Sequence, residues 1–168
     1  RIHDLTASKE NPIPGTATEV ITPNWDDELA QRNIEVSLGN NGRLEVELPG
    51  TLEIKKTVVS EVDAPEKDFS FKLSLTNAEG ESLTGEFDAQ KFDTIGVESG
   101  DAFKVKNHAT VTLKDGEFVK IYGLSNGDKY KIEETEIPKG FTAKTNPIEG
   151  TIVGNKIVAA AFENTYAA

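Results

Sequence analysis

The chain has 168 residues and a formal net charge of −11, which argues against binding to nucleic acid or to an anionic membrane surface. The absence of cysteine excludes disulfides, thiolate nucleophiles and thiol metal sites, and the absence of methionine predicts a piece cut from a longer protein. No apolar run is long enough to span a bilayer, and no secretory signal peptide is recognisable. The length fits one domain, or one domain plus part of another.

Residues 1–50 are predicted to be the tail of a preceding domain or an N-terminal extension packed on the next one. This segment holds four of the seven prolines, which disfavour long regular elements. A polar stretch that begins at Trp25 is compatible with one or two helical turns capped by Asn24. Two runs of alternating apolar residues flank the turn sequence GNNG and predict a hairpin over 33–50. This segment is too short for an immunoglobulin-like sandwich, which needs about 100 residues.

Residues 51–168 read as a series of short strands separated by turn signals. In chain order we predict a strand over 51–59, a polar loop over 60–68, a strand over 69–77, a long acidic connection over 83–101 with room for one short strand, one or two strands over 102–113, strands over 117–124 and 128–135, a loop over 142–150 and two strands over 151–166. Short strands at roughly ten-residue spacing indicate an all-β fold, an antiparallel β-sandwich of about seven strands.

Alternation along these strands predicts both the core and three polar residues that face it. The apolar residues expected to be buried are Leu52, Ile54, Phe71, Leu73, Val119, Ile121, Ile132 and Phe162. The same alternation places Lys56, Glu134 and Asn164 on the buried faces of their strands. Their chain neighbours are expected to face solvent: Lys55, Glu133 and Glu163. A lone buried carboxylate is costly unless it is neutral or partnered, so Glu134 is expected to meet a partner in the core.

The stretch YKIEETEIPKGF, residues 130–141, resembles the E-box of Gram-positive pilins and surface adhesins, a pattern of the form YxLxETxAPxGY. The matching positions are Tyr130, Ile132, Glu134, Thr135, Pro138, Gly140 and Phe141, with conservative changes at Ile132 and Phe141. Ile137 replaces the usual alanine. The pattern is typical of the Cna-B-type immunoglobulin-like domain, and the resemblance covers residues 51–168 and hardly any of residues 1–50.

That resemblance implies an intramolecular isopeptide bond, because many members of this family join a first-strand lysine to an asparagine in the last strand. On this sequence the crosslinked residues would be Lys56 and Asn164, the latter in the motif FEN, and Glu134 would be the acidic residue that assists. Burial favours a neutral lysine, which can attack the amide carbon, and a protonated glutamic acid, which can polarise the amide carbonyl. The reaction occurs once per molecule and releases ammonia, so the chain is not expected to be an enzyme.

Simpler interpretations exist for each of these residues and for the other candidate sites. A lysine–glutamate pair is usually a salt bridge, and an asparagine near a chain end is usually a turn residue. The two histidines, His3 and His108, are far apart and are expected to be exposed. Two acidic groups could suggest calcium, but they lack the spacing of an EF-hand and are better explained as solvated turns: Asp26, Asp27 and Glu28, and Asp115 and Glu117. No metal or cofactor is therefore expected.

Two function classes follow from the resemblance. The first is a structural stalk or shaft domain of a Gram-positive cell-surface pilin or adhesin, with neighbouring domains or pilus subunits as partners. The alternative is a ligand-binding adhesin domain that recognises a host protein or glycan, for which Trp25 and the connection over 83–101 are the only supporting features. The sorting signal LPxTG does not occur in the chain, so an extracellular, wall-anchored location is implied by the resemblance alone.

Overall fold

The computed structural model describes residues 35–38 and 44–167. The first two strands, β1 (Glu35–Leu38) and β2 (Leu44–Glu47), pair antiparallel as a hairpin, as the sequence predicts for this segment. The turns expected after Asn24, the residue Trp25 and the acidic group Asp26 to Glu28 lie outside the described residues. The assignment of residues 1–50 to a preceding domain or to an extension therefore stays a prediction.

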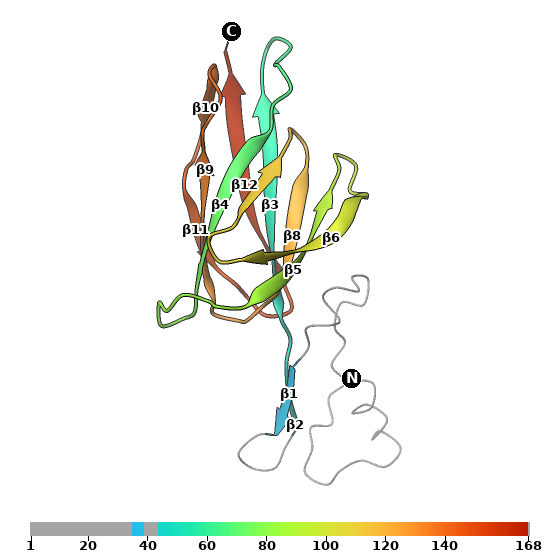
Figure 1. The fold of residues 1–168 in the computed structure, drawn as a ribbon, viewed down its shortest axis with the longest axis vertical. Helices are drawn as coiled ribbons and strands as arrows, with labels where there is room; N and C mark the ends of the chain where they lie inside the picture. Colours follow the sequence, from blue (N-terminus) through green and yellow to red (C-terminus); the bar gives the residue numbers. More distant parts are fainter. Residues whose placement is uncertain (1–34, 39–43, 168) are drawn as a thin grey trace.

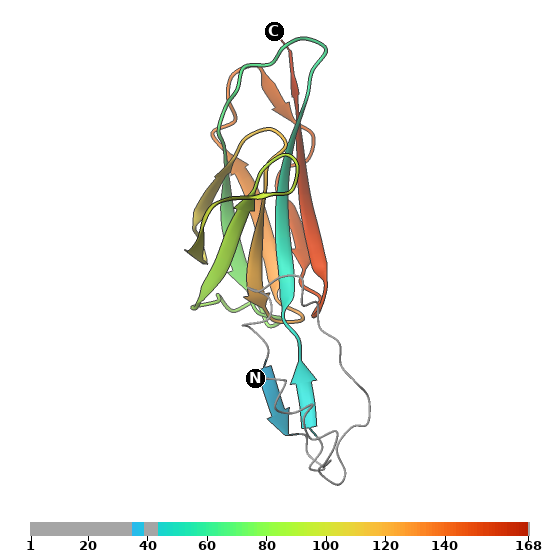
Figure 2. The same ribbon diagram turned by 90° about the vertical axis from the view of Figure 1, so that its right-hand side faces the viewer.

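The remaining strands form two sheets that pack face to face (Figures 1 and 2). The six-stranded sheet has the order β10-β12-β3-β8-β5-β6, built from Phe141–Ala143, Ile157–Tyr166, Gly50–Val59, Phe118–Leu124, Glu86–Phe92 and Glu98–Lys106. The four-stranded sheet has the order β11-β9-β4-β7, built from Ile148–Thr151, Lys129–Thr135, Phe69–Thr76 and Thr110–Leu113. The described part of the chain contains no helix, and the prediction of an all-β sandwich is confirmed.

The core lies between the two sheets and is made by the residues that alternation predicts. All eight side chains expected to be buried have at most 1% of their surface exposed: Leu52, Ile54, Phe71, Leu73, Val119, Ile121, Ile132 and Phe162. Phe71 of β4 packs against Phe162 of β12, with ring centroids 4.8 Å apart, so this contact joins the two sheets directly. Side chains that leave water in this way supply most of the free energy that favours folding.

One pair of strands departs from the antiparallel pattern. β12 runs parallel to β3 along its length, from Ile157 opposite Thr51 to Thr165 opposite Val59. The two strands are bonded at their starts, where Asn155 N donates to Pro49 O and Thr51 N donates to Lys156 O, at 2.9 Å each. The turn before β12 is thus bonded to the chain that enters β3. Both strands begin at the same end of the sandwich and run to the opposite end (Figure 1).

Two segments contain more strand than the sequence pattern indicates. The connection expected over 83–101 holds all of β5 and the start of β6, and the loop expected over 142–150 holds most of β10 and β11. In β5 the alternation is interrupted by a register shift, where the side chain of Gln90 donates to Ser99 O and Gly100 O at 3.4 and 3.1 Å. A bulge of this kind removes the period-two pattern on which a sequence-based assignment depends. The sandwich therefore has more strands than the seven or so predicted.

Candidate functional site

The structure brings Lys56, Glu134 and Asn164 together in the core. Lys56 lies on β3 and Asn164 on the adjacent parallel strand β12, where Asn164 is paired with Val58. Glu134 lies on β9 of the facing sheet, opposite Phe71 of β4. The exposed fractions are 0% for Lys56 and Asn164 and 3% for Glu134, as the alternation predicts. The three side chains therefore connect both sheets in a region without access to bulk water.

One oxygen atom of Glu134 holds the other two residues. Lys56 Nζ lies 3.1 Å from Glu134 Oε2, and Asn164 Nδ2 donates to the same oxygen at 2.7 Å. The other oxygens, Glu134 Oε1 and Asn164 Oδ1, are buried and have no hydrogen-bond partner among the described residues. A buried polar atom without a partner costs about 1–3 kcal/mol. The lysine amine and the asparagine amide thus meet at the carboxyl group of Glu134. One oxygen of Glu134 and the carbonyl oxygen of Asn164 accept no hydrogen bond from the described residues.

One aromatic ring contacts the lysine and is the first of a chain of three rings. Lys56 Nζ lies 4.2 Å from the ring centroid of Phe69, whose ring meets Phe141 edge to face at 5.2 Å, and Phe141 packs on Tyr166 at 4.9 Å. Phe141 ends the motif over 130–141 and enters β10 after a turn in which Gly140 has φ +92°, a conformation that favours glycine. Sequence reasoning missed Phe69 as a site residue. The alternation of β4 predicts that Phe69 is buried, but not that it faces Lys56.

Burial lowers the pKa of Lys56 below its usual value of 10.5. The charge and hydrogen bond of Glu134 oppose this shift, and the charge of Asp115 opposes it more weakly. The loss of hydration is the largest of these contributions, so the structure favours a neutral amine more than water does. A neutral amine is the form that can act as a nucleophile.

This shift predicts how stability changes with pH in an Asn164→Ala variant, in which Lys56 stays a free amine. Asn164 is not among the causes of the shift, so the lowered pKa should persist. Between the folded pKa and 10.5 the unfolded chain binds more protons than the folded chain. The free energy of unfolding should therefore rise with pH across this window and fall as pH drops through the folded pKa. Urea unfolding at a series of pH values measures it.

The control for this experiment is the double variant Lys56→Met and Asn164→Ala, which has no amine at the site. Titrating groups away from the site change the stability of both variants with pH in the same way, so the difference between the two curves reports Lys56 and its contact with Glu134. That difference should change in favour of the lysine-containing variant as pH rises. A difference that is flat, or that changes in the opposite direction, would contradict a lowered lysine pKa.

The other candidate residues have structural roles or are exposed. Asp115 Oδ1 accepts from Val58 N and Glu117 Oε1 accepts from Lys114 N, each at 2.7 Å, so these carboxylates organise the turn between β7 and β8. No cluster of three or more metal-ligating side chains occurs within the described ranges. His108 is exposed in a turn, with φ 74°, whereas His3 lies outside the described part of the chain.

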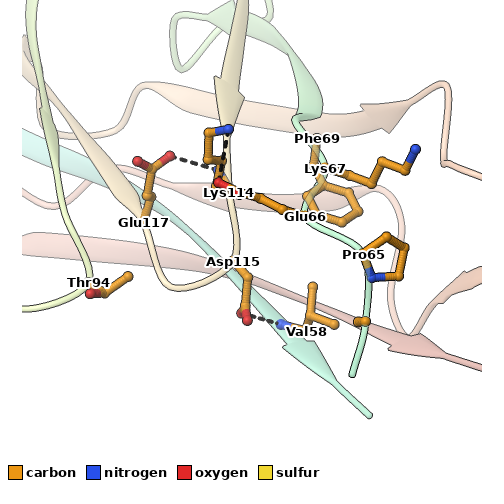
Figure 3. Close-up of a pocket in the computed structure, with 10 residues that line it drawn as sticks. Val58, Pro65, Glu66, Lys67, Phe69, Thr94, Lys114, Asp115 and Glu117 are labelled. Carbon is orange, nitrogen blue, oxygen red and sulfur yellow. Dashed lines mark hydrogen bonds and ion pairs between the residues drawn. The ribbon is translucent and has the colours of Figure 1, made fainter. Parts of the chain in front are cut away.

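A pocket of about 360 Å³ lies where β3 ends, between the loop over 60–68 and the β7–β8 turn (Figure 3). The residues that line it are Val58, Ala64, Pro65, Glu66, Lys67, Phe69, Thr94, Lys114, Asp115 and Glu117. Lys114 Nζ lies 3.1 Å from Glu66 Oε1 and 3.6 Å from Asp68 Oδ1. The wall carries charges of both signs, so it does not favour a ligand of one charge. Phe69 also contacts Lys56, so this residue connects the pocket to the buried site.

Asn146 contacts the backbone of Glu134 and was not singled out from the sequence. Glu134 N donates to Asn146 Oδ1 at 2.8 Å, and Asn146 Nδ2 donates to Glu134 O at 2.9 Å. The residue lies in the segment predicted as a loop, and asparagines are common in loops for many reasons. The two hydrogen bonds, next to the pairing of β9 with β11, show that this asparagine lies beside the glutamate.

Comparisons with known proteins find a domain family and similarity to pilus proteins. A family model described as "Domain of unknown function (DUF7601)" matches residues 50–166. The pilus tip adhesin Cpa of Streptococcus pyogenes is 34% identical over 84 residues, which are 50% of this chain and 11% of that protein. The chain therefore spans a small part of this curated relative.

Solved structures show the same fold. The pilus-presented adhesin Cpa aligns with a TM-score of 0.57 and 25% identity, over 74% of this chain and 30% of the other. The major pilin from Streptococcus pyogenes aligns with a TM-score of 0.59 and 21% identity, over 74% of this chain and 50% of the other. These relatives are adhesins and pilins and not enzymes, which agrees with the expectation for this chain. No segment that the structure describes is a helix able to cross a membrane.

Proposed function

The chain belongs to the family described as "Domain of unknown function (DUF7601)", and we propose that residues 51–168 form a stalk or shaft domain of a Gram-positive surface pilin or adhesin, stabilised by a self-formed Lys56–Asn164 isopeptide bond. The E-box and Cna-B resemblance of residues 130–141 supports the proposal, as do the named pilus relatives. Its partners would be neighbouring domains or subunits of the same surface protein. Its location would be extracellular, on the cell wall or pilus.

The observation that carries this proposal is the contact of Lys56 and Asn164 with the same oxygen of Glu134 in the core. Lys56 Nζ attacks Asn164 Cγ, a new C–N bond forms, and the bond from Cγ to Nδ2 breaks. The neutral amine loses one proton and the leaving nitrogen gains one, so that ammonia departs and the atoms balance. Groups held in contact react as if at very high concentration, which compensates for the low reactivity of an amide.

Glu134 would carry the protons in this reaction. The charged pair Lys56⁺/Glu134⁻ and the neutral pair Lys56/Glu134-H have the same total charge, and a dry site disfavours separated charges. Moving one proton from Lys56 to Glu134 therefore produces the nucleophile and the acid together. A half-turn of the Asn164 amide exchanges Nδ2 with Oδ1, and the carbonyl oxygen can then accept from protonated Glu134. This contact would give a donor to Asn164 Oδ1, an oxygen that has no hydrogen-bond partner among the described residues.

The alternative function, recognition of a host protein or glycan, has less support. It rests on Trp25, which lies outside the described residues, and on the connection over 83–101. In the structure that connection belongs largely to strands β5 and β6 of the six-stranded sheet, so it is not a long free loop. The buried trio of Lys56, Glu134 and Asn164, by contrast, has a geometry suited to one reaction within the chain.

Intact-mass measurement tests the proposed bond. The wild-type chain should weigh one ammonia less than its sequence requires, and Lys56→Ala, Asn164→Ala and Glu134→Ala should each have the full mass. Lys55→Ala is the matched control, because Lys55 is exposed on the same strand and its loss should leave the deficit unchanged. A wild-type chain at full mass would refute the proposal. A deficit that survives Glu134→Ala would remove Glu134 from the mechanism.

A further inference from the structure

Asn146 occupies the position on the strand register that lies opposite Glu134. β11 pairs with β9 from Thr151 opposite Lys129 to Ile148 opposite Ile132, where the ladder ends. Two further steps along the same antiparallel register place residue 146 opposite residue 134. The step between them is Pro147, which has no N–H to donate and cannot continue the ladder.

The Asn146 side chain takes the place of the β11 backbone beside Glu134, where the ladder has ended. Its amide carries one acceptor and one donor in the spacing of a backbone peptide group, and it bonds both Glu134 N and Glu134 O, at 2.8 and 2.9 Å. On its other side β9 pairs with β4, where Glu134 lies opposite Phe71. The backbone of Glu134 is therefore held from both sides, although the β11 ladder stops before it.

Resting on the proposed crosslink, we propose that Asn146 is a positioning residue for that reaction, fixing the backbone of Glu134 so that its carboxyl group reaches both Lys56 Nζ and Asn164 Nδ2. The two contacts of Glu134 Oε2, at 3.1 and 2.7 Å, need one placement of β9 relative to the facing sheet. Without Asn146, the backbone of Glu134 at the end of β9 would lose both of these side-chain hydrogen bonds. Asn146 is itself exposed, so its replacement leaves no cavity in the core.

The rate of ammonia loss tests this role. The full-length chain is made in a short pulse of cell-free synthesis and quenched in acid at increasing times, and intact mass gives the crosslinked fraction. Asn146→Ala should slow the reaction by about ten- to a hundredfold, since a misplacement of about 1 Å can cost a hundredfold in rate. Asn146→Asp keeps the acceptor for Glu134 N and loses the donor to Glu134 O, and it should give an intermediate rate.

Asn107→Ala is the matched control for local stability. Asn107 Oδ1 accepts from Leu75 N at 2.7 Å, so it also supports a strand backbone in the four-stranded sheet, away from the trio. Thermal unfolding in an Asn164→Ala background, where no crosslink forms, measures the structural cost of each change. Asn107→Ala should destabilise this background about as much as Asn146→Ala does and leave the crosslinking rate at the wild-type value.

The outcomes separate the two proposals. Slow crosslinking in Asn146→Ala alone, with partial recovery in Asn146→Asp, supports a positioning role. Equal rates for Asn146→Ala and wild type, or equal slowing by Asn107→Ala, would overturn that role while leaving the crosslink proposal intact. A wild-type chain that never loses ammonia would refute the crosslink itself.

Discussion

An Asn164→Ala variant should unfold at a much lower temperature than the wild-type chain. The proposed bond closes a loop of about a hundred residues, and a disulfide across such a loop contributes about 4–5 kcal/mol through the entropy of the unfolded chain. For a domain of this size that free energy corresponds to a fall in Tm of roughly 15–20 °C. Calorimetry or circular dichroism on the two proteins measures the difference.

Three variants separate the crosslink from local damage. Asn164→Ala also removes buried atoms, whereas Glu134→Gln keeps the shape of the side chain while removing the carboxyl acid. Lys56→Met keeps an apolar stem of similar length. All three should have the full mass and a similarly lowered Tm, while the exposed Lys55→Ala should melt like the wild type. The entropic account would be wrong if Glu134→Gln, at full mass, melted at the wild-type temperature.

When the chain is pulled from its two ends, the wild type and the Asn164→Ala variant should also differ greatly in how far they extend. In the crosslinked chain the force passes from the start of β3 to Lys56, across the new amide to Asn164 and out through the end of β12. The residues between Lys56 and Asn164 bear no load and cannot be pulled out. The Asn164→Ala variant should instead release about a hundred residues at about 3.4 Å each, a step of about 340 Å in contour length.

Single-molecule force spectroscopy detects this step directly. Wild type and Lys55→Ala should extend without it, because both retain the amide, and Lys56→Met should show it as Asn164→Ala does. Release of the full step by a wild-type chain that has already lost one ammonia would mean that the bond joins residues other than Lys56 and Asn164.

The sequence was sufficient for the fold class, the core and the meeting of the three polar residues. Period-two alternation decides which side of a strand a residue faces, so Lys56, Glu134 and Asn164 could be assigned to the interior one strand at a time. The resemblance of residues 130–141 to the E-box then gave the reason to expect these three residues at one site. Neither source of information depends on knowing which strands are neighbours.

Features that depend on strand neighbours were missed. The bonding of Asn146 to Glu134 follows from the β9–β11 register, and the packing of Phe69 on Lys56 follows from how the two sheets face each other. The sequence leaves room for one short strand over 83–101, but the bounds of β5 could not be given because Gln90 fills a bulge and interrupts the alternation. The extra strands at the sheet edges are short and half exposed, so their residues carry little hydrophobic pattern.

The parallel pairing of β3 and β12 also determines how copies of such a domain can be joined. Gly50 lies where β3 begins, and Tyr166 lies at the opposite end of the sandwich, where β12 ends (Figure 1). Units linked end to end through these two points would be related mainly by translation, and each would add at least the length of a ten-residue strand, about 33 Å. An antiparallel pairing would return the chain to its point of entry, and successive units would then branch sideways instead of lengthening a rod.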